Sequence, residues 1–406
     1  MEVMKAVLII CDGMADRPVK SLGDRTPLEV AKKPNMDKIA EEGICGVMYT
    51  IGPGIPPGSD TAHLALLGYD PYQVYTGRGP FEAAGAGLEL KPGDVAFRAN
   101  YASVDDNLVV TDRRAGRIQS PPELEEAIQK IKLPVKFQFK NTLGHRAVLV
   151  LQGKGLSAAV SDTDPHDVGK KVLEAKALDK SAAARRTAQI LNLFTEKVYR
   201  ALRDHPLNRQ RKKENLPPAN MVLVRGAGVV PHLEPFGERT GIKAACVAAA
   251  ALVKGVCRLA GLEVVEVEGA TGNTQTNLKG KVDATLRALE RNDLVLLHIK
   301  AFDELSHDGK AKEKVEFIQT VDSHLGKLWG KADFLILTAD HTTPVEFKEH
   351  AGDPVPIALS GPGVRRDEVK SFDERSCARG GLGYIRGREL VPILANLMGR
   401  MEKFGA

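Results

Sequence analysis

Short apolar runs bounded by charged or turn-forming residues recur along the chain. The clearest are KAVLIIC near the N-terminus, DLVLLHI from residue 293 and DFLILT from residue 333. Runs of this length, rich in Val, Ile and Leu, are typical of strands buried on both faces of a parallel sheet. The pattern therefore predicts core strands at residues 6–11, 294–299 and 334–338.

Segments with helical spacing of apolar residues alternate with such runs outside the middle of the chain. Gly43 ends one of these helices, and TAHLALLGYD predicts another that ends at Gly68. The alternation predicts an α/β domain with a mainly parallel sheet. The other expected elements are helices at 34–42, 241–261 and 314–329 and one through Leu397, and strands at 47–51, 262–269 and 355–360.

The pattern changes between residues 73 and 236, where turn signals separate strands such as VKFQFKN and HRAVLVLQG. Residues 167–204 predict a long polar helix. The basic run NRQRKKENLPP that follows predicts a solvated loop rather than a nucleic-acid site, because no aromatic residues are interleaved for base stacking. We expect an α+β domain, 73–236, inserted into a discontinuous domain made of 1–72 and 237–406.

Composition narrows the class of protein only a little. An apolar fraction of 43% excludes wholesale disorder, and a net charge of +5 fits an anionic small substrate without requiring one. Five cysteines without CxxC spacing give no disulfide framework or zinc ribbon and favour reduced thiols in a cytoplasmic protein. The apolar runs are too short for a signal peptide or for the ~20 residues of a membrane-spanning helix, so no membrane partner is expected.

Acidic and histidine residues follow each of the three core strands. A single pair of this kind has an ordinary explanation, a capping Asp beside a surface His. Because the carboxyl ends of parallel strands converge on one crevice, however, these side chains can meet. Oxygen and imidazole donors without thiolates suit manganese, zinc, iron or cobalt, so we expect a two-metal site. Its candidate ligands are Asp12, Asp303, His307, Asp340, His341 and His350.

Ser59 lies where a Gly/Pro-rich loop meets a predicted helix. Its side chain could cap a helix beginning at Asp60, or act as a nucleophile, and the two roles are compatible because a helix N-terminus also stabilises a phosphate. Gly54 and Gly58 would let the backbone approach a ligand. His63, one turn on, could touch a transferred phosphoryl group or simply pack against the helix.

Five motifs in this order carry a family resemblance: ICDGMADRP, PGSDTAHLALLGYDP, TGRGPFEAAGAG, DELSHDG and TADHTTP. Together they span almost the whole chain, which resembles the archaeal-type 2,3-bisphosphoglycerate-independent phosphoglycerate mutases of the alkaline phosphatase superfamily. The resemblance implies a phosphatase-like, three-layer α/β domain that carries two metals, and an inserted domain that binds glycerate. It also implies a place in glycolysis and gluconeogenesis, in the cytoplasm, with a homo-oligomer as a possible assembly.

The resemblance assigns roles to individual residues. Ser59 would take the phosphoryl group from 3-phosphoglycerate and return it to the 2-hydroxyl, which makes 2,3-bisphosphoglycerate unnecessary. Two divalent ions, with manganese expected and zinc or cobalt as alternatives, would assist each transfer. One ion would be held by Asp12, Ser59, Asp340 and His341, and the other by Asp303, His307 and His350.

Substrate contacts follow less directly from the resemblance, because the motif GSDTAH around Ser59 departs from the bacterial type. A mutase must keep water from its phosphoserine, so the inserted domain is expected to close and bring arginines to the substrate anions. Lys254 could neutralise the phosphate or extend from an apolar helix into water, and each arginine could equally be a surface residue. The arginine candidates are Arg98, Arg113, Arg114 and Arg117.

Other functions remain to be weighed against the mutase. A metal-dependent phosphatase, or a mutase for another phosphate ester, could use the same residues. A phosphonopyruvate decarboxylase would need a thiamine-diphosphate motif, GDG with a distal NN, which we do not find. A non-catalytic binding protein with this fold should have lost a ligand or the nucleophile, and all seven positions are intact.

Overall fold

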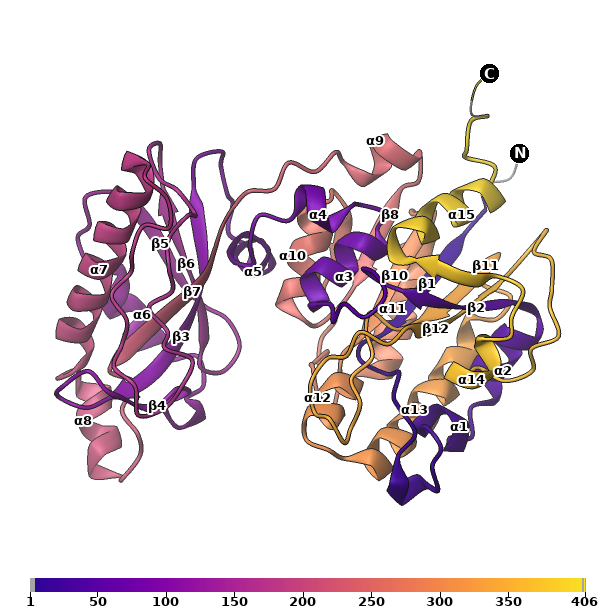
Figure 1. Ribbon diagram of the computed structural model, residues 1–406, viewed down its shortest axis with the longest axis horizontal. Helices are drawn as coiled ribbons and strands as arrows, with labels where there is room; N and C mark the ends of the chain where they lie inside the picture. The colour runs from indigo at the N-terminus through magenta and orange to yellow at the C-terminus, as the bar shows by residue number, and fades with distance from the viewer. Residues whose placement is uncertain (1–3, 404, 406) are drawn as a thin grey trace. The chain divides into compact units, whose positions relative to one another are not determined.

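The computed structural model describes residues 4–403 and residue 405 of the chain. Contacts divide it into two compact units. One comprises the residues up to Tyr75 and those from Leu233 onward, and the other is the insertion Thr76–His232 (Figure 1). The sequence placed these boundaries after residues 72 and 236.

Within the described residues, the first unit is built on an eight-stranded sheet with the order β13-β2-β12-β11-β1-β10-β8-β9. The central strand β1 pairs in parallel with β10 and β11, while β12 runs antiparallel to its neighbours β11 and β2. The expectation of a mainly parallel sheet is confirmed. The strands are β1 (Ala6–Cys11), β2 (Gly43–Tyr49), β8 (Ala244–Val247), β9 (Glu263–Val265), β10 (Leu294–Ile299), β11 (Phe334–Thr338), β12 (Val355–Ser360) and β13 (Gly383–Arg386).

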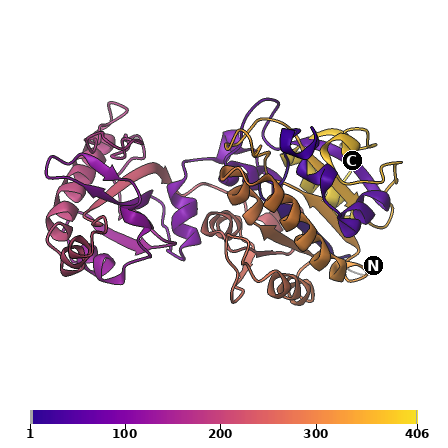
Figure 2. The ribbon, with the colours of Figure 1, turned by 90° about the horizontal axis from the view of Figure 1, so that it is seen from below.

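Helices cover both faces of this sheet (Figures 1 and 2). Helices α3, α10 and α15 lie on one side of the strands and α13 lies on the other (Figure 1). No helix in the described part of the chain is long and apolar enough to cross a membrane. The helices are α1 (Pro27–Val30), α2 (Pro34–Glu41), α3 (Ser59–Leu66), α4 (Pro71–Val74), α9 (Phe236–Thr240), α10 (Ala251–Leu259), α11 (Leu278–Leu289), α12 (Ala301–His307), α13 (Ala311–Leu325), α14 (Glu374–Cys377) and α15 (Leu390–Leu397).

Two sequence predictions in this unit are wrong. The apolar stretch 241–261 is not one helix, because its first part is the buried strand β8 and only α10 is helical. A strand covered on both faces is as continuously apolar as a buried helix, so periodicity alone does not separate them. Strand β2 also starts earlier than residue 47, at Gly43, whose missing side chain leaves room for the Leu359 carbonyl oxygen.

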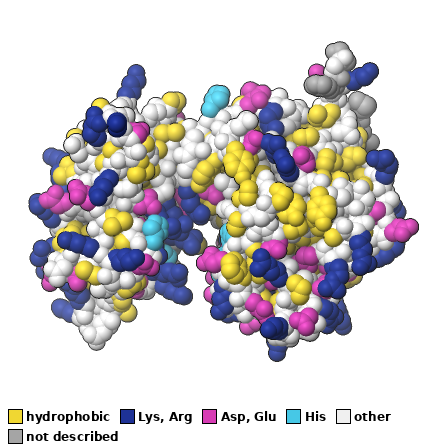
Figure 3. Space-filling model, viewed as in Figure 1, with side chains coloured by type: hydrophobic (Ala, Val, Ile, Leu, Met, Phe, Trp, Pro, Cys, Tyr) yellow, Lys and Arg dark blue, Asp and Glu magenta, His cyan; other side chains and the backbone are white. Residues whose placement is uncertain are grey.

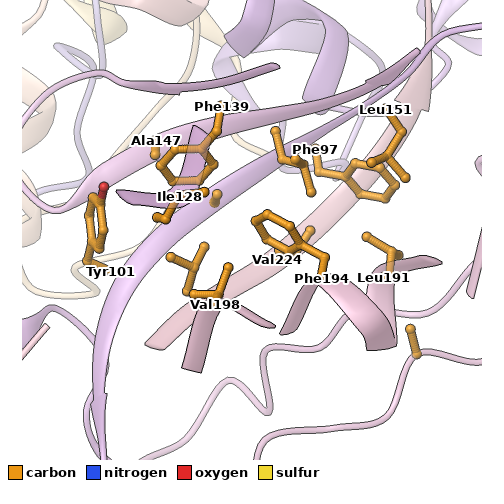
Figure 4. Close-up of a cluster of buried hydrophobic side chains, with 14 of the residues drawn as sticks. Phe97, Tyr101, Ile128, Phe139, Ala147, Leu151, Leu191, Phe194, Val198 and Val224 are labelled. Carbon is orange, nitrogen blue, oxygen red and sulfur yellow. The ribbon is translucent and has the colours of Figure 1, made fainter. Parts of the chain in front are cut away.

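The inserted unit contains an antiparallel sheet in which β3 lies between β6 and β7. A hydrophobic core that includes Phe97, Phe139 and Phe194 fills the space between this sheet and helix α7 (Figure 4). A smaller apolar cluster on the opposite face packs against α5. The elements are α5 (Gly79–Gly85), β3 (Val95–Val104), β4 (Val110–Asp112), α6 (Pro122–Gln129), β5 (Lys136–Asn141), β6 (Arg146–Gln152), α7 (Ala182–Leu202), α8 (Pro206–Lys213) and β7 (Met221–Val229).

Two predictions for the inserted unit are also wrong. The long helix expected at 167–204 starts only at α7, where the Ser181 side chain accepts the Ala184 N–H and caps the helix. The segment before it is irregular and pairs locally through single bridges such as Val109 with Lys171. The basic run 208–218 is partly helical, because Pro206 starts α8 and the helix continues to Lys213.

Candidate active site

The parallel register of the central sheet brings the ends of β1, β10 and β11 together. Cys11 pairs with Ile299, and Ile10 pairs with both His298 and Thr338. The residues that follow these strands therefore start from neighbouring positions at one edge of the sheet. This register places Asp12 and Asp340 beside each other, and the Gly13 N–H donates to Asp340 Oδ1 at 3.0 Å.

One group of candidate ligands surrounds the ring of His341. Its Nε2 lies 3.4 Å from Asp340 Oδ2, 3.5 Å from Asp12 Oδ1 and 3.5 Å from Ser59 Oγ. All four residues are buried, with Ser59 the most exposed at 9%. Three elements of the fold supply these atoms, and they are the four positions that the resemblance assigns to one metal.

A second group surrounds the carboxylate of Asp303. Asp303 Oδ1 lies 3.3 Å from His307 Nε2 and 3.2 Å from His350 Nε2. Asp303 and His307 share one face of the short helix α12, four residues apart, as their spacing suggested. His350 comes from the loop before β12, and its ring stacks on that of His341 with 3.7 Å between centroids.

Backbone carbonyls orient two of the histidine rings. His307 Nδ1 lies 2.7 Å from the Lys348 carbonyl oxygen, and His350 Nδ1 lies 2.7 Å from the Pro57 carbonyl oxygen. A carbonyl only accepts, so each Nδ1 carries the proton and donates it. When such a ring is neutral, its lone pair is therefore on Nε2, the atom that faces Asp303 and a cation bound there.

Ser59 is the first residue of α3, and Gly58, rather than Ser59, is the N-cap residue. The expected cap by Ser59 is wrong, since its hydroxyl makes no cap bond and lies near His341 instead. The helix start still bears on its chemistry, because the first N–H groups of α3 favour negative charge at this point. The Ser59 hydroxyl is thus not used as a cap, and it lies beside the candidate ligands at the start of α3.

His63 is fully buried beneath this serine. Its Nδ1 donates to the Ser59 carbonyl oxygen at 2.7 Å and lies 3.7 Å from Asp340 Oδ2. Burial lowers the pKa of His63 to about 3, so the ring is neutral. The contacts with the described residues place His63 as a support for the Ser59 turn.

Burial and the neighbouring cationic or hydrogen-bonding residues set the pKa values of the carboxylates in the two groups. Burial raises the pKa of Asp12, but Lys300 and His298 lower it more, and the net shift is downward. Burial likewise raises the pKa of Asp303, but the neighbouring His307 and His350 rings and Lys300 lower it more, and the net shift is downward. Both carboxylates are therefore ionised at neutral pH.

Three residues that the sequence did not single out complete the site. Lys300 Nζ bonds Asp12 Oδ1 at 2.9 Å and Asp303 Oδ2 at 2.6 Å, and thereby joins the two groups. Thr343 also contacts both groups, and His298 bonds Asp12. A signal for His298 and Lys300 was present, since both are polar residues at the end of an apolar strand that precedes Asp303.

The residues fit divalent cations in kind and in placement. Carboxylate oxygens and ring nitrogens are the donors that suit manganese, zinc or cobalt. Asp340 Oδ2 is buried and has no hydrogen-bond partner among the described residues, although burial and the nearby Asp12 raise the pKa of this carboxyl. An unsatisfied buried oxygen is costly unless a ligand occupies it, so its presence next to His341 supports a cation there.

The inserted unit carries a cluster of arginines on the α5 face of its sheet. Glu82 of α5 bonds Arg78 at 2.9 Å and lies 4.0 Å from Arg98. Arg225 of β7 pairs in register with Arg98 of β3. Burial lowers the pKa of Arg98 to about 9, so its guanidinium stays charged at neutral pH.

A second buried carboxylate holds the rest of this cluster. Asp164 bonds Arg113 at 2.8 Å and lies 3.8 Å from Arg225. Arg113, Arg98 and Arg225 each keep a buried Nε without a hydrogen-bond partner in the described part of the chain. The cluster therefore holds four guanidinium groups and two carboxylates, which gives it a net charge of +2. On the surface, Lys and Arg side chains gather along one margin of this unit (Figure 3).

The other expected substrate residues lie apart from this cluster or at its edge. Arg114 and Arg117 are exposed, and Arg114 is one of the charged neighbours that, after burial, lower the pKa of His145. Lys254 forms an ion pair with Glu266. The structure therefore groups Arg98 and Arg113 and leaves the other three outside the group.

Comparison with known proteins identifies the family. Residues 40–208 match the family described as 2,3-bisphosphoglycerate-independent phosphoglycerate mutase. A protein of that name from Methanothermobacter thermautotrophicus is 52% identical over 409 residues, which cover 99% of this chain and 100% of the relative. A solved structure from Pyrococcus horikoshii is 40% identical, with a TM-score of 0.87 over 100% of both chains. The cofactor-independent phosphoglycerate mutase from Thermoplasma acidophilum is 38% identical, with a TM-score of 0.72 over 98% of this chain and 100% of that one. This chain belongs to the family of 2,3-bisphosphoglycerate-independent phosphoglycerate mutases.

Proposed function

We propose that this protein interconverts 3-phosphoglycerate and 2-phosphoglycerate through a phosphoserine at Ser59, without 2,3-bisphosphoglycerate. The observation that carries the proposal is the position of Ser59 Oγ, 3.5 Å from His341 Nε2 at the first turn of α3. A hydroxyl placed among carboxylates, imidazoles and helix N–H groups suits phosphoryl transfer. We assign the reaction to glycolysis and gluconeogenesis in the cytoplasm.

The transfer occurs in two displacements at phosphorus. Ser59 Oγ forms a bond to phosphorus while the bond to the 3-oxygen of glycerate breaks, and the serine proton ends on that oxygen. In the second displacement the 2-hydroxyl of the glycerate bonds to phosphorus, the bond to Ser59 Oγ breaks, and the proton of the 2-hydroxyl ends on Ser59. Atoms and charge balance, and no other phosphate donor is needed.

Two divalent cations fit the two groups of ligands. Asp12, Ser59, Asp340 and His341 would hold one, and Asp303, His307 and His350 the other. When bound, such cations neutralise phosphoryl charge and lower the pKa of a coordinated hydroxyl. The donor set suits manganese, zinc or cobalt alike, and manganese is our candidate on the family resemblance. Lys300, which bonds Asp12 and Asp303, adds a fixed positive charge to the same place.

Arg98 and Arg113 are our candidates for binding the carboxylate or phosphate of the substrate. Guanidinium groups match these anions with two parallel hydrogen bonds. The buried Nε atoms of both side chains have no partner in the described residues, and Glu82 and Asp164 hold the two guanidinium groups in place. Arg114, Arg117 and Lys254 remain candidates on the sequence resemblance alone.

The decisive experiment follows phosphorus directly. Metal-free protein is supplied with Mn²⁺ and 3-phosphoglycerate, and ³¹P NMR records the appearance of 2-phosphoglycerate and inorganic phosphate. Ser59→Ala should abolish interconversion and still bind metal, whereas Ser323→Ala, on the surface helix α13, should behave like the wild type. Full mutase activity in Ser59→Ala would remove the serine from the mechanism.

A phosphatase, or a mutase for another ester, is the second candidate, because the same nucleophile and cations would serve it. The two differ in the fate of the phosphoserine. Rapid release of inorganic phosphate from several esters without any 2-phosphoglycerate would favour the phosphatase. Retention of the phosphoryl group on glycerate would favour the mutase.

A further inference from the structure

Thr343 lies between the two groups of candidate ligands and touches a member of each. We propose that its hydroxyl is a positioning group that couples the two cation sites, so that divalent cations load cooperatively. This inference rests on the proposed function, since it concerns the same centre, and it adds a residue and a property that the ligand set alone does not contain.

The hydrogen bonds of Thr343 have a defined direction. Its Oγ1 lies 3.2 Å from Asp303 Oδ1 and 2.9 Å from His341 Nδ1. An ionised carboxylate only accepts, so the hydroxyl donates its single proton to Asp303. The hydroxyl oxygen is then an acceptor, and His341 must supply the proton from Nδ1.

This direction decides the state of the His341 ring. With the proton on Nδ1, the lone pair is on Nε2, the atom that lies among Asp12, Asp340 and Ser59. The orientation of a carboxylate in one group therefore selects the imidazole tautomer in the other. The Thr343 hydroxyl, which is fully buried and shielded from water, transmits the orientation of Asp303 to the His341 ring.

His341 differs in this respect from the other two rings. His307 and His350 donate to backbone carbonyls, whose orientation does not depend on the occupancy of the other cation site. The partner of His341 is a side-chain hydroxyl that can rotate when Asp303 no longer accepts its proton. Only this ring therefore links the two sites through its second nitrogen.

The backbone holds Thr343 firmly in position. Its N–H donates to the Ala15 carbonyl oxygen at 3.1 Å, and its own carbonyl oxygen accepts from Lys314 Nζ at 3.2 Å. Gly13 packs so closely that a Cβ at that position would lie 2.8 Å from Thr343 Oγ1 and 2.9 Å from Asp303 Cα. The hydroxyl is thus confined to the space between Asp303 and His341.

The test uses Co²⁺ as the probe, since its visible absorption reports coordination independently of turnover. Metal-free full-length protein is titrated with Co²⁺ by absorption and calorimetry, for the wild type, Thr343→Val and Thr343→Ser. Thr342→Val is the matched control, because Thr342 is equally buried but its hydroxyl bonds only the carbonyl oxygens of Asp353 and Pro354.

We expect the wild type, Thr343→Ser and Thr342→Val to bind two Co²⁺ per chain with a Hill coefficient above one. Thr343→Val should bind without cooperativity, and its weaker site should lose about 10–100-fold in affinity, the usual effect of removing a hydrogen bond to a metal ligand. Cooperative binding that is kept in Thr343→Ser and lost in Thr343→Val would show that the effect comes from the hydroxyl and not from the volume of the side chain.

Each contrary result has a distinct meaning. A Thr343→Val isotherm identical to that of the wild type overturns the role of the hydroxyl. Independent binding of two Co²⁺ by the wild type overturns the coupling even if the valine variant does not fold. A wild type that binds fewer than two Co²⁺ overturns both the coupling and the proposed metal centre. Cooperative Co²⁺ binding in a protein without mutase activity would leave the coupling intact and overturn the proposed function.

Discussion

Nε2 of His298 donates to Oδ2 of Asp12 at 2.8 Å, and both side chains are completely buried. The two residues lie at the ends of adjacent strands, β10 and β1. Lys300 bonds the other oxygen, Oδ1, at 2.9 Å, so both oxygens of this carboxylate are held by side chains that reach it from the neighbouring strand. Asp12 is therefore positioned before any ligand binds.

His298→Ala should weaken divalent cation binding about 10–100-fold, since partners that orient a metal ligand contribute this much. Mutase activity of the variant should fall at limiting Mn²⁺ and recover in part at excess Mn²⁺. Activity measured against Mn²⁺ concentration checks the expectation. The control is His324→Ala, which alters a histidine on the outer helix α13. An unchanged Mn²⁺ dependence in His298→Ala would contradict the positioning role.

Arg113→Met should raise KM for 3-phosphoglycerate about 10–100-fold, because a hydrogen bond to a charged group contributes about 1.5–3 kcal/mol and each 1.4 kcal/mol is a factor of ten. Co²⁺ binding should be unaffected, since Arg113 contacts Asp164 in the inserted unit and none of the candidate metal ligands. Steady-state kinetics measure the change in KM, and a Co²⁺ titration of the same variant measures metal binding separately. Arg185→Met, on helix α7, is the control, and equal KM values in the two variants would remove Arg113 from substrate binding.

Glu374 begins helix α14 and accepts hydrogen bonds from the Asp16 N–H at 2.9 Å and the Thr26 hydroxyl at 2.6 Å. Burial raises the pKa of this carboxyl from 4.5 to about 7. The folded protein therefore keeps a proton on Glu374 that the unfolded chain loses above pH 4.5. The stabilising contribution is complete below pH 4.5 and is lost as the pH rises to about 7.

Glu374→Gln should remove this pH dependence. The stability of the wild type relative to the variant should fall between pH 5 and pH 7, by at most about 3 kcal/mol, because each pH unit between the two pKa values changes it by at most about 1.4 kcal/mol. Urea unfolding with a chelator present, at both pH values, gives the difference. The exposed Glu368→Gln serves as the control, and a wild-type-to-Glu374→Gln difference that does not change with pH would contradict the raised pKa.

Removal of divalent cations should lower the thermal stability of the unit that carries the candidate ligands. A cation present at 100 times its Kd stabilises the folded state by about 2.7 kcal/mol for each site. The single tryptophan, Trp329, belongs to this unit, so its fluorescence follows the unfolding in question. Mn²⁺ should raise Tm in the wild type and have a smaller effect in Asp303→Asn. An equal rise in both proteins would exclude Asp303 as a ligand.

Several core strands of the first unit were predictable from the sequence. Residues 294–299, 334–338 and 355–360 were expected as strands and are β10, β11 and β12. Their apolar runs are short and end at residues that break the pattern. The error at 241–261 arose because β8 passes into α10 within one apolar run, and only pairing with β10 identifies its first part as a strand. The helix expected at 167–204 begins later than predicted, because composition indicates a helix-forming segment but does not fix the residue that caps its start.

By itself the sequence determined the central strands β1, β10 and β11 and the acidic and histidine residues that follow them, because spacing and polarity are local properties. Only the tertiary structure decided which atoms meet. His298, Lys300 and Thr343 contact Asp12, Asp303 and His341 because parallel pairing sets residues from opposite ends of the chain side by side. The direction of a hydrogen bond, and with it the tautomer of a ring, depends on such neighbours in space, and no spacing along the chain encodes it.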